Sequence, residues 1–311
     1  MKKLLGIVVL CLLICNKSFT DNQFNPPKDV ASGNKYNKSL EKNFKKHGVQ
    51  VVDKKDGHPV RAGNKSLRFE VRPEDCGYDD SWNDCKKDRE RHELSGKSMS
   101  KGKWWYAWSI YLPEDYINIY SSKTALGQFH QHGGHPVFMF NNLGGGYWVS
   151  REILGDNTID TQILTREKMI GRWTDVLVNV KWSKKNNGFF KVWINNKPVY
   201  DYKGQTKTEE KTYFKFGIYR SFMSRYLNYH NLSPEVEECF KKNGASANQI
   251  YKFKKRKKMN SKLSYKIYNK CKHLYKITKV PAQIVYYDEV RVGKTRKKVV
   301  GNLPPLKLKN F

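Results

Sequence analysis

Apolar and polar residues alternate in several segments of the chain with the two-residue period of a β-strand. The clearest case is RWTDVLVNVKWS (172–183), which places Val176, Val178, Val180 and Trp182 on one face and Asp175, Asn179 and Lys181 on the other. KWWYAWSIYLP (103–113), FFKVWINNKPVYDY (189–202) and QIVYYDEVRVG (283–293) are also typical of strands, with turns at KKNNG (184–188) and Asn195–Asn196. The pattern predicts a mainly β fold, an antiparallel two-sheet β-jelly-roll sandwich of the concanavalin type.

TYFKFGIYRS (212–221) is a predicted strand with an unusual second face. Successive side chains of a strand point to opposite faces. The face expected in the core carries Phe214, Phe216 and Ile218. The opposite face carries Tyr213, Lys215, Gly217 and Tyr219. Two phenols and an ammonium group around a glycine are not typical of a face that meets only water, so we interpret it as the wall of a binding site.

The segment 225–280 interrupts the strand pattern. Ser233, followed by acidic residues, marks a helix start, and Gly244 marks a helix end. The lysine-rich stretch beyond it, which includes KFKKRKK (252–258), fits either a helix or a mobile arm. We expect one jelly-roll domain over residues 21–311 with a basic, partly helical insertion at 225–280. This insertion is either an electrostatic clamp on a polyanion or a solvated lobe.

Residues 1–20 have the features of a secretory signal peptide. Lys2 and Lys3 precede an apolar run over residues 4–14, and small residues follow before the expected cut. The run is too short to span a bilayer as a stable anchor. Ile14 before Cys15 argues against a lipoprotein site, which needs a small residue there. We expect a secreted or periplasmic protein without a membrane span.

The chain contains six cysteines, and removal of the signal peptide leaves four. An even number in an exported protein favours disulfides, and four cysteines allow three connectivities. Of these we predict the local pairs Cys76–Cys85 and Cys239–Cys271. A short loop closed in this way stabilises a fold by about 3 kcal/mol. A zinc site is not supported, since no CxxC spacing occurs.

The charge of the chain is strongly positive. Lys and Arg number 59 and Asp and Glu 29, which gives a net charge of +30. Such a charge attracts polyanions: nucleic acid, an anionic membrane surface or an acidic polysaccharide. Export argues against nucleic acid, so we expect the partner to be an anionic polysaccharide. We also expect the protein to be a monomer. A lysine-rich but merely solvated surface would have the same composition.

Two short motifs carry reactive side chains. RHEL (91–94) places Arg91 and Glu93 on one strand face, where the carboxylate can orient the guanidinium toward a carboxylate of a substrate. QFHQH (128–132) places Gln128, His130 and His132 on one face, and histidine exchanges protons near neutral pH.

A metal site is the competing interpretation of the histidines around residue 130. His130, His132 and His135 lie close together in the chain, but they have neither helical spacing nor an acidic fourth ligand. We therefore predict no metal site and no required cofactor. A structural calcium ion is compatible with the sequence, but nothing in the sequence indicates one.

RHEL, QFH and YFKFGIYR resemble, in order and approximate separation, three motifs of the jelly-roll polysaccharide lyases. Alginate lyases of this class carry RxEL, Q[IV]H and YFKAGxY. The chain is also similar to the heparin lyase I-type family through WYAWSIYLP, GRWTDVLVNVKWS, VWINNKPV and YYDEVRVG. The resemblance covers about residues 60–225 and 280–295. The chain departs from the alginate pattern at His92, Phe216 and Arg220, where serine, alanine and asparagine are usual.

The resemblance implies an enzyme that cuts a uronate-containing polysaccharide by β-elimination. It assigns neutralisation of the substrate carboxylate to Arg91 and Gln128, removal of the C5 proton to His130, and protonation of the leaving O4 to Tyr219, which could also perform both proton transfers. It makes Lys215, Tyr213 and His132 substrate-binding residues. The residues alone also allow a non-catalytic carbohydrate-binding sandwich, a polyanion-binding adhesin, or a glycoside hydrolase. A hydrolase needs two facing carboxylates, which no motif supplies.

Overall fold

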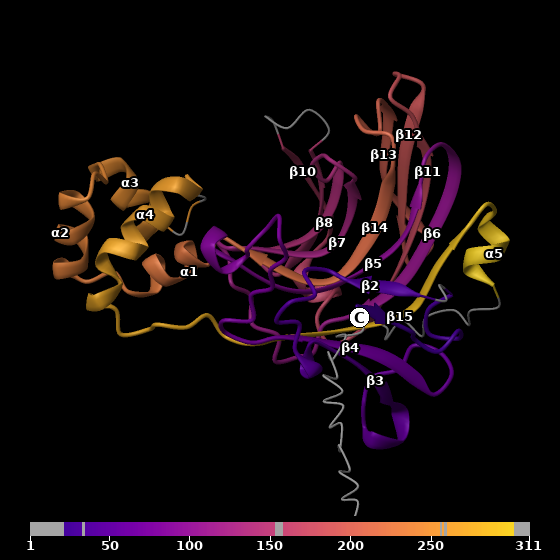
Figure 1. Cartoon of the computed structure of the whole chain (residues 1–311), viewed down its shortest axis with the longest axis horizontal. Coiled ribbons are helices and arrows are strands. Elements are labelled where there is room, and N and C mark those ends of the chain that lie inside the picture. Colours follow the sequence, from indigo (N-terminus) through magenta and orange to yellow (C-terminus); the bar gives the residue numbers. More distant parts are fainter. Residues whose placement is uncertain (1–21, 33–34, 153–157, 256, 258–259, 302–311) are drawn as a thin grey trace, which may run out of the picture.

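The computed structural model describes residues 22–32, 35–152, 158–255, 257 and 260–301. Its strands form two antiparallel sheets packed face to face, and a group of helices lies to one side of them (Figure 1). The predicted signal peptide lies outside the described residues. The two-sheet sandwich of the jelly-roll class that the alternating pattern predicts is confirmed.

The larger sheet has the strand order β1-β2-β5-β14-β7-β8-β9-β10. These strands are β1 (Gln23–Phe24), β2 (Tyr36–Lys38), β5 (Arg89–Met99), β7 (Lys123–Gln131), β8 (Phe138–Leu143), β9 (Gly146–Arg151), β10 (Ile159–Leu164) and β14 (Thr212–Ser221). β14 pairs with β5 on one side and β7 on the other, although both precede it by a long stretch of chain. The topology therefore brings the three motif-bearing segments together as neighbours.

The smaller sheet has the order β13-β12-β11-β6-β15-β4-β3. Its strands are β3 (Val49–Asp53), β4 (Lys65–Val71), β6 (Gly102–Tyr111), β11 (Trp173–Trp182), β12 (Gly188–Ile194), β13 (Lys197–Gly204) and β15 (Gln283–Gly293). Asn195 and Asn196 join β12 to β13 with positive φ angles of 50° and 65°, as the predicted turn requires. Helix α5 (Arg296–Val300) covers the outside of this sheet, where Val299 packs near Leu177.

Aromatic side chains from both sheets fill the space between them. Phe138 of the larger sheet stacks on Phe190 of the smaller one at 3.8 Å between ring centroids, and Trp108 lies 4.7 Å from Phe214. Burying each such ring stabilises the fold by roughly 1.5–3 kcal/mol. The predicted core face of β14 is confirmed, because Phe214, Phe216 and Ile218 are all buried.

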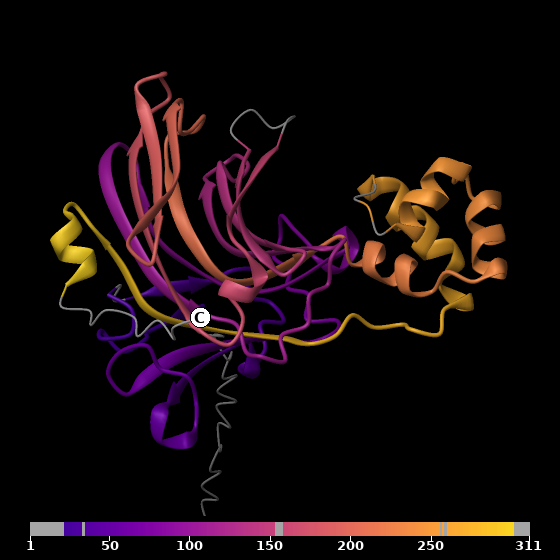
Figure 2. The ribbon, with the colours of Figure 1, turned by 180° about the vertical axis from the view of Figure 1, so that it is seen from behind.

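The helices between β14 and β15 form a lobe with its own core. They are α1 (Met223–His230), α2 (Pro234–Lys242), α3 (Ala247–Lys254) and α4 (Ser261–Cys271). Phe240, Phe253 and Ile267 are buried among them. Ser233 caps α2 by accepting a hydrogen bond from Val236 N, as predicted. Figure 2 shows from behind that this helical lobe stands beside the sandwich rather than on a sheet face.

Two disulfides join cysteines in the predicted pairs. Cys76–Cys85 closes the loop between β4 and β5, and Cys239–Cys271 joins α2 to α4 in the helical lobe. Each region therefore has one covalent restraint of its own. Among the described residues, no helix has the length and apolar character needed to cross a membrane.

Candidate active site

The site is built on three neighbouring strands, β5, β14 and β7. Their register places Tyr219 opposite Arg91, Lys215 opposite Gln128, and Tyr213 opposite His130. Because cross-strand partners lie about 5 Å apart, these side chains meet on one sheet face. The structure thus brings together the residues that the three motifs contribute from distant parts of the chain.

Gly217 lies between Lys215 and Tyr219 on β14, at a position where a side chain would not fit. Its φ angle is 129°, which side chains rarely allow, and a Cβ atom there would lie 2.4 Å from the backbone oxygen of His92. Tyr287 of the opposite sheet donates a hydrogen bond to the Gly217 carbonyl at 2.9 Å. The glycine of the motif therefore permits close contact between β14 and β5 beneath the site.

Glu93 is the buried carboxylate that pairs with the positively charged side chains of this face. It is fully buried and lies 3.0 Å from Lys215 Nζ, and it accepts a hydrogen bond of 2.5 Å from Gln128 Nε2. Burial acts to raise the pKa of the Glu93 carboxyl, but the charges of Lys215 and Arg91 outweigh it and hold this pKa below its usual value. A charged Glu93 thereby orients Lys215 and Gln128 at once.

Arg91 has a principal partner that the motifs do not indicate. Asp84 accepts hydrogen bonds from Arg91 Nε at 2.5 Å and Nη2 at 2.7 Å, whereas Glu93 is 3.4 Å from Nη1. Glu93 therefore contacts the guanidinium as RHEL predicts, but the shorter hydrogen bonds go to Asp84. Asp84 comes from the loop closed by Cys76–Cys85, and its place beside a cysteine of a short disulfide loop is the one sequence signal that could have pointed to it.

Tyr219 lies between two arginines. The guanidinium of Arg91 covers its ring at 4.0 Å from the centroid, and Arg89 Nε donates a hydrogen bond of 2.8 Å to its hydroxyl. The hydroxyl oxygen of Tyr219 thus accepts from a charged donor. Arg89 was not among the predicted site residues, although its position two residues before Arg91 places it on the same strand face.

His130 is half-buried and uncharged at neutral pH. Burial, assisted by the charge of Lys215, lowers the pKa of His130 to about 4. Its Nδ1 lies 2.8 Å from the carbonyl oxygen of Gln131, an acceptor only, so Nδ1 carries the proton and Nε2 keeps the lone pair. The side chain can therefore accept a proton through Nε2.

Tyr213 and His132 extend the face away from Tyr219. The Tyr213 ring lies 5.5 Å from the His130 ring and 4.8 Å from the His132 ring, measured between centroids. His132 is exposed, and its Nε2 is 2.6 Å from Ser98 Oγ. Burial raises the pKa of Tyr213, with Glu93 adding to the effect, so Tyr213 keeps its proton at neutral pH. These two residues form a rim of the face that could contact a sugar.

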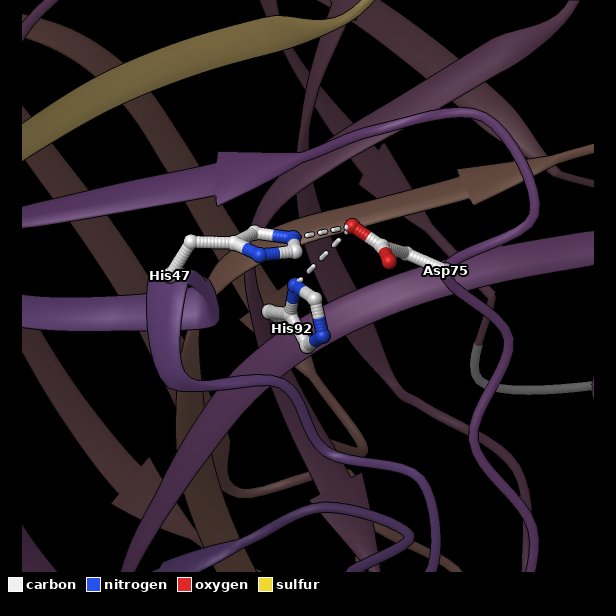
Figure 3. Close-up of side chains that lie close together, drawn as sticks. All are labelled: His47, Asp75 and His92. Atoms are coloured by element: carbon white, nitrogen blue, oxygen red, sulfur yellow. Dashed lines mark hydrogen bonds and ion pairs between the residues drawn. The ribbon is translucent and has the colours of Figure 1, made fainter.

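A different group of side chains has the spacing of metal ligands. Among the described residues, the candidate atoms of His47, Asp75 and His92 lie within 4.8 Å of one another (Figure 3). His92 Nδ1, however, lies 2.7 Å from the Glu70 carbonyl oxygen, and its Nε2 accepts a hydrogen bond from Lys45 N at 3.3 Å. Both ring nitrogens are thus engaged, and His92 offers no lone pair to a metal.

Comparisons with known proteins give one family match. A family model described as polysaccharide lyase matches residues 31–291. The fold is similar to an endo-β-1,4-glucuronan lyase from the fungus Trichoderma reesei, with 16% identity, 82% of this chain and 91% of that chain covered, and a TM-score of 0.46. It is also similar to the alginate lyase AlgAT5 of polysaccharide lyase family 7 (12%, 80% and 83%, TM-score 0.43) and to an alginate lyase from Alteromonas sp. 272 (12%, 87% and 98%, TM-score 0.40). Among curated proteins, none matches the chain.

Proposed function

The chain belongs to the polysaccharide lyase family, and we propose that it cleaves a uronate-containing polysaccharide by β-elimination on the face formed by β5, β14 and β7. The observation that carries this proposal is the arrangement of Tyr219. Its hydroxyl accepts a hydrogen bond from Arg89 on the same face as His130, Gln128 and Lys215. A proton-transfer group is thus held among positive groups that suit a sugar acid.

The proposed reaction has two bond-breaking events. A base takes the proton from C5 of the uronate, and the electron pair of that C–H bond forms the double bond between C4 and C5. The bond between C4 and the glycosidic oxygen breaks, and an acid supplies a proton to that oxygen. Negative charge develops on the carboxylate while C5 loses its proton, so preorganised donors at the carboxylate contribute most to the rate.

The net positive charge of the side chains on this face equals the negative charge of one substrate carboxylate. Arg89, Arg91 and Lys215 contribute three positive charges, and Asp84 and Glu93 contribute two negative ones. One positive charge thus remains unmatched within this set. Three of the five N–H groups of Arg91 contact Asp84 and Glu93, which leaves one on each Nη for a substrate carboxylate. Gln128, which is 1% exposed and donates to Glu93, is the second donor proposed for that carboxylate.

His130 is the proposed base and Tyr219 the proposed acid. The low pKa of His130 keeps it neutral and ready to accept the C5 proton, and its Nε2 has the free lone pair. The Tyr219 oxygen accepts from Arg89, so its own proton is available for O4. In the alternative mechanism Tyr219 performs both transfers, and Arg89 remains in contact with its oxygen.

The buried state of the acidic residues favours a lyase over a glycoside hydrolase. Hydrolases of this kind need two carboxyl groups that flank the glycosidic bond. Asp84 and Glu93, the carboxylates of the site, are fully buried and paired with Arg91 and Lys215. Because both carboxylates are occupied by cations of the site itself, neither is free to act on a sugar or on a hydrolytic water.

A panel of polyguluronate, polymannuronate, glucuronan and heparin tests the proposal. A lyase produces an unsaturated sugar that absorbs ultraviolet light, a hydrolase produces new reducing ends without that absorbance, and a binding protein produces neither. Heparin stands for the sulfated substrates that a heparin lyase I-like enzyme would prefer, and the net charge of +30 supports its inclusion. No unsaturated product from any uronate polymer would contradict the proposal.

The remaining expectations form part of the same proposal. The enzyme acts outside the cytoplasm as a monomer, and the two disulfides support an oxidising location. The proposed steps use side chains alone, so activity should survive treatment with a chelator. Sedimentation of the purified protein and an activity assay with EDTA check these two points.

A further inference from the structure

An exposed tryptophan stands directly beside the proposed carboxylate-binding arginine. Trp82 lies in the loop closed by Cys76–Cys85 and keeps 40% of its surface exposed. Its indole Nε1 donates a hydrogen bond of 2.8 Å to Asp84 Oδ1, the same oxygen that accepts from Arg91 Nη2 at 2.7 Å. The indole and the guanidinium are therefore neighbours on one buried carboxylate.

The loop holds this indole in a fixed position. Asp79 Oδ1 accepts hydrogen bonds from Ser81 N at 2.8 Å and from Trp82 N at 2.7 Å, and Asp79 N donates to the Trp82 carbonyl at 2.8 Å. The backbone turn and the Nε1 contact together restrain an aromatic ring that the core does not bury. An exposed ring that is already ordered loses little entropy when it binds a partner.

We propose that Trp82 is a stacking platform for a neighbouring sugar unit of the bound polysaccharide, next to the unit whose carboxylate Arg91 holds. Sugar rings present apolar C–H faces, and exposed aromatic rings with a fixed geometry are the usual partners of such faces in binding sites. Lys87 Nζ lies 5.7 Å from the ring centroid and adds positive charge for the uronate of that unit. This inference rests on the proposed function, because it assumes that a uronate chain crosses the face.

The alternative role of Trp82 is purely structural. Its N–H group could serve only to orient Asp84 and, through it, Arg91. The two roles depend on different parts of the side chain, since stacking needs the ring and orientation needs the N–H group. Trp82→Phe keeps a ring and removes the N–H group, whereas Trp82→Ala removes both.

The experiment measures KM and kcat on the best substrate of the uronate panel for Trp82→Ala, Trp82→Phe and Tyr78→Ala. Tyr78 is the matched control, because it lies in the same disulfide loop with 42% of its surface exposed. We expect Trp82→Ala to raise KM about tenfold with the smaller effect on kcat, as for lost uniform binding. Trp82→Phe should stay within about threefold of the parent KM, and Tyr78→Ala should match the parent.

Three results would overturn the platform. An unchanged KM in Trp82→Ala would show that the ring does not touch substrate. A kcat loss in Trp82→Phe as large as that in Trp82→Ala would assign the residue to the positioning of Asp84. A KM increase in Tyr78→Ala equal to that in Trp82→Ala would assign the effect to the loop as a whole.

Calorimetric binding of the same polymer to each variant in a Tyr219→Phe background separates this inference from the proposed function. A parent protein that binds the polymer but releases no unsaturated product would contradict the lyase proposal. The affinity difference between the Trp82→Ala and Trp82→Phe forms would still decide the role of the ring, with about a tenfold weaker binding expected for Trp82→Ala.

Discussion

The sandwich and the helical lobe use positively charged residues in opposite ways. In the sandwich, Lys215 is 5% exposed and lies against Glu93, and burial lowers its pKa. In the lobe, lysines such as Lys255 and Lys266 are exposed, and Lys and Arg far outnumber the three glutamates, Glu235, Glu237 and Glu238. The candidate active site holds a few charges in fixed geometry, whereas the lobe presents many charges to solvent.

The difference follows from the cost of removing a charge from water. A buried ion must have a partner, because the desolvation cost of an unpaired charge amounts to several kcal/mol. Pairing fixes the geometry, which catalysis requires. An exposed ion costs little and acts on polyanions at a distance, but salt screens it with a Debye length of about 8 Å at physiological ionic strength. The buried ion pairs of the site therefore suit the proposed chemistry, and the exposed lysines of the lobe would suit long-range attraction of a polyanion.

The two regions meet beside Tyr219. Asp88, the residue before Arg89, accepts hydrogen bonds from Ser224 N and Oγ at the start of α1. Phe222 lies under two guanidinium groups, those of Arg89 at 4.2 Å and Arg225 at 4.1 Å from its ring centroid. The helical lobe is therefore anchored at the end of β14 that carries the proposed acid.

The largest expected effect is on the buried ion pair of the sandwich. Asp84→Ala leaves the Arg91 guanidinium buried without its main partner, so we expect a loss of about 3–5 kcal/mol in the free energy of unfolding. Glu237→Ala in the lobe is the matched control, because Glu237 pairs with Lys254 at 2.6 Å near the surface. Its loss should be about 1 kcal/mol or less. Urea denaturation measures both, and equal losses would contradict the contrast between the regions.

The next effect concerns proton transfer. His130→Ala and Tyr219→Phe should each fold and lose activity by a factor of about 100 or more, the usual contribution of a positioned acid or base. Tyr251→Phe supplies a control in the lobe, where the ring is 50% exposed, and should keep the parent rate. Initial rates of ultraviolet absorbance on the best uronate polymer give the comparison. A nearly normal kcat in either site variant would remove that residue from the mechanism.

The pH dependence of the sandwich should reflect the low pKa of His130. Its folded-state pKa of about 4 lies below the ordinary value of about 6.5. The neutral base is therefore present above pH 4, and kcat/KM should fall only as the pH drops through about 4. Unfolded His130 binds a proton near pH 6.5 and folded His130 only near pH 4. The free energy of unfolding should therefore be highest above about pH 6.5 and should decrease as the pH falls toward 4. His130→Gln should remove that part of the stability profile, which denaturation at several pH values measures.

The smallest effect is expected from the lobe lysines. Replacing Lys252, Lys254, Lys255 and Lys257 with Ser should raise KM severalfold at low salt and leave kcat close to the parent value, because only long-range attraction is lost. The control is a set with the same charge change at exposed lysines in and beside the smaller sheet: Lys54, Lys55, Lys65 and Lys185. Equal KM values for the two sets over a range of salt concentrations would show that the lobe is only a solvated surface.

Much of the fold could be predicted from local patterns. The alternating positions of β11 and the span of β14 agree with the sequence-based expectations, as do the helix cap at Ser233 and the two disulfides. The strand faces and the helix cap depend on residues close together in the chain, and the disulfides on an even number of cysteines in an exported protein. Asp84 and Arg89 could not be predicted in the same way, because their partners, Arg91 and Tyr219, become neighbours through a disulfide loop and through strand pairing.

The sequence by itself determined which side chains share a strand face, since alternation along a strand is a local property of the backbone. Alternation alone therefore separates Lys215 and Tyr219 from Phe214 and Phe216. Only the tertiary structure decided that β14 lies between β5 and β7, because hydrogen bonding between strands is possible for many partners and registers. That pairing, and the return of Asp84 beneath Arg91, turns three separate motifs into one charged face.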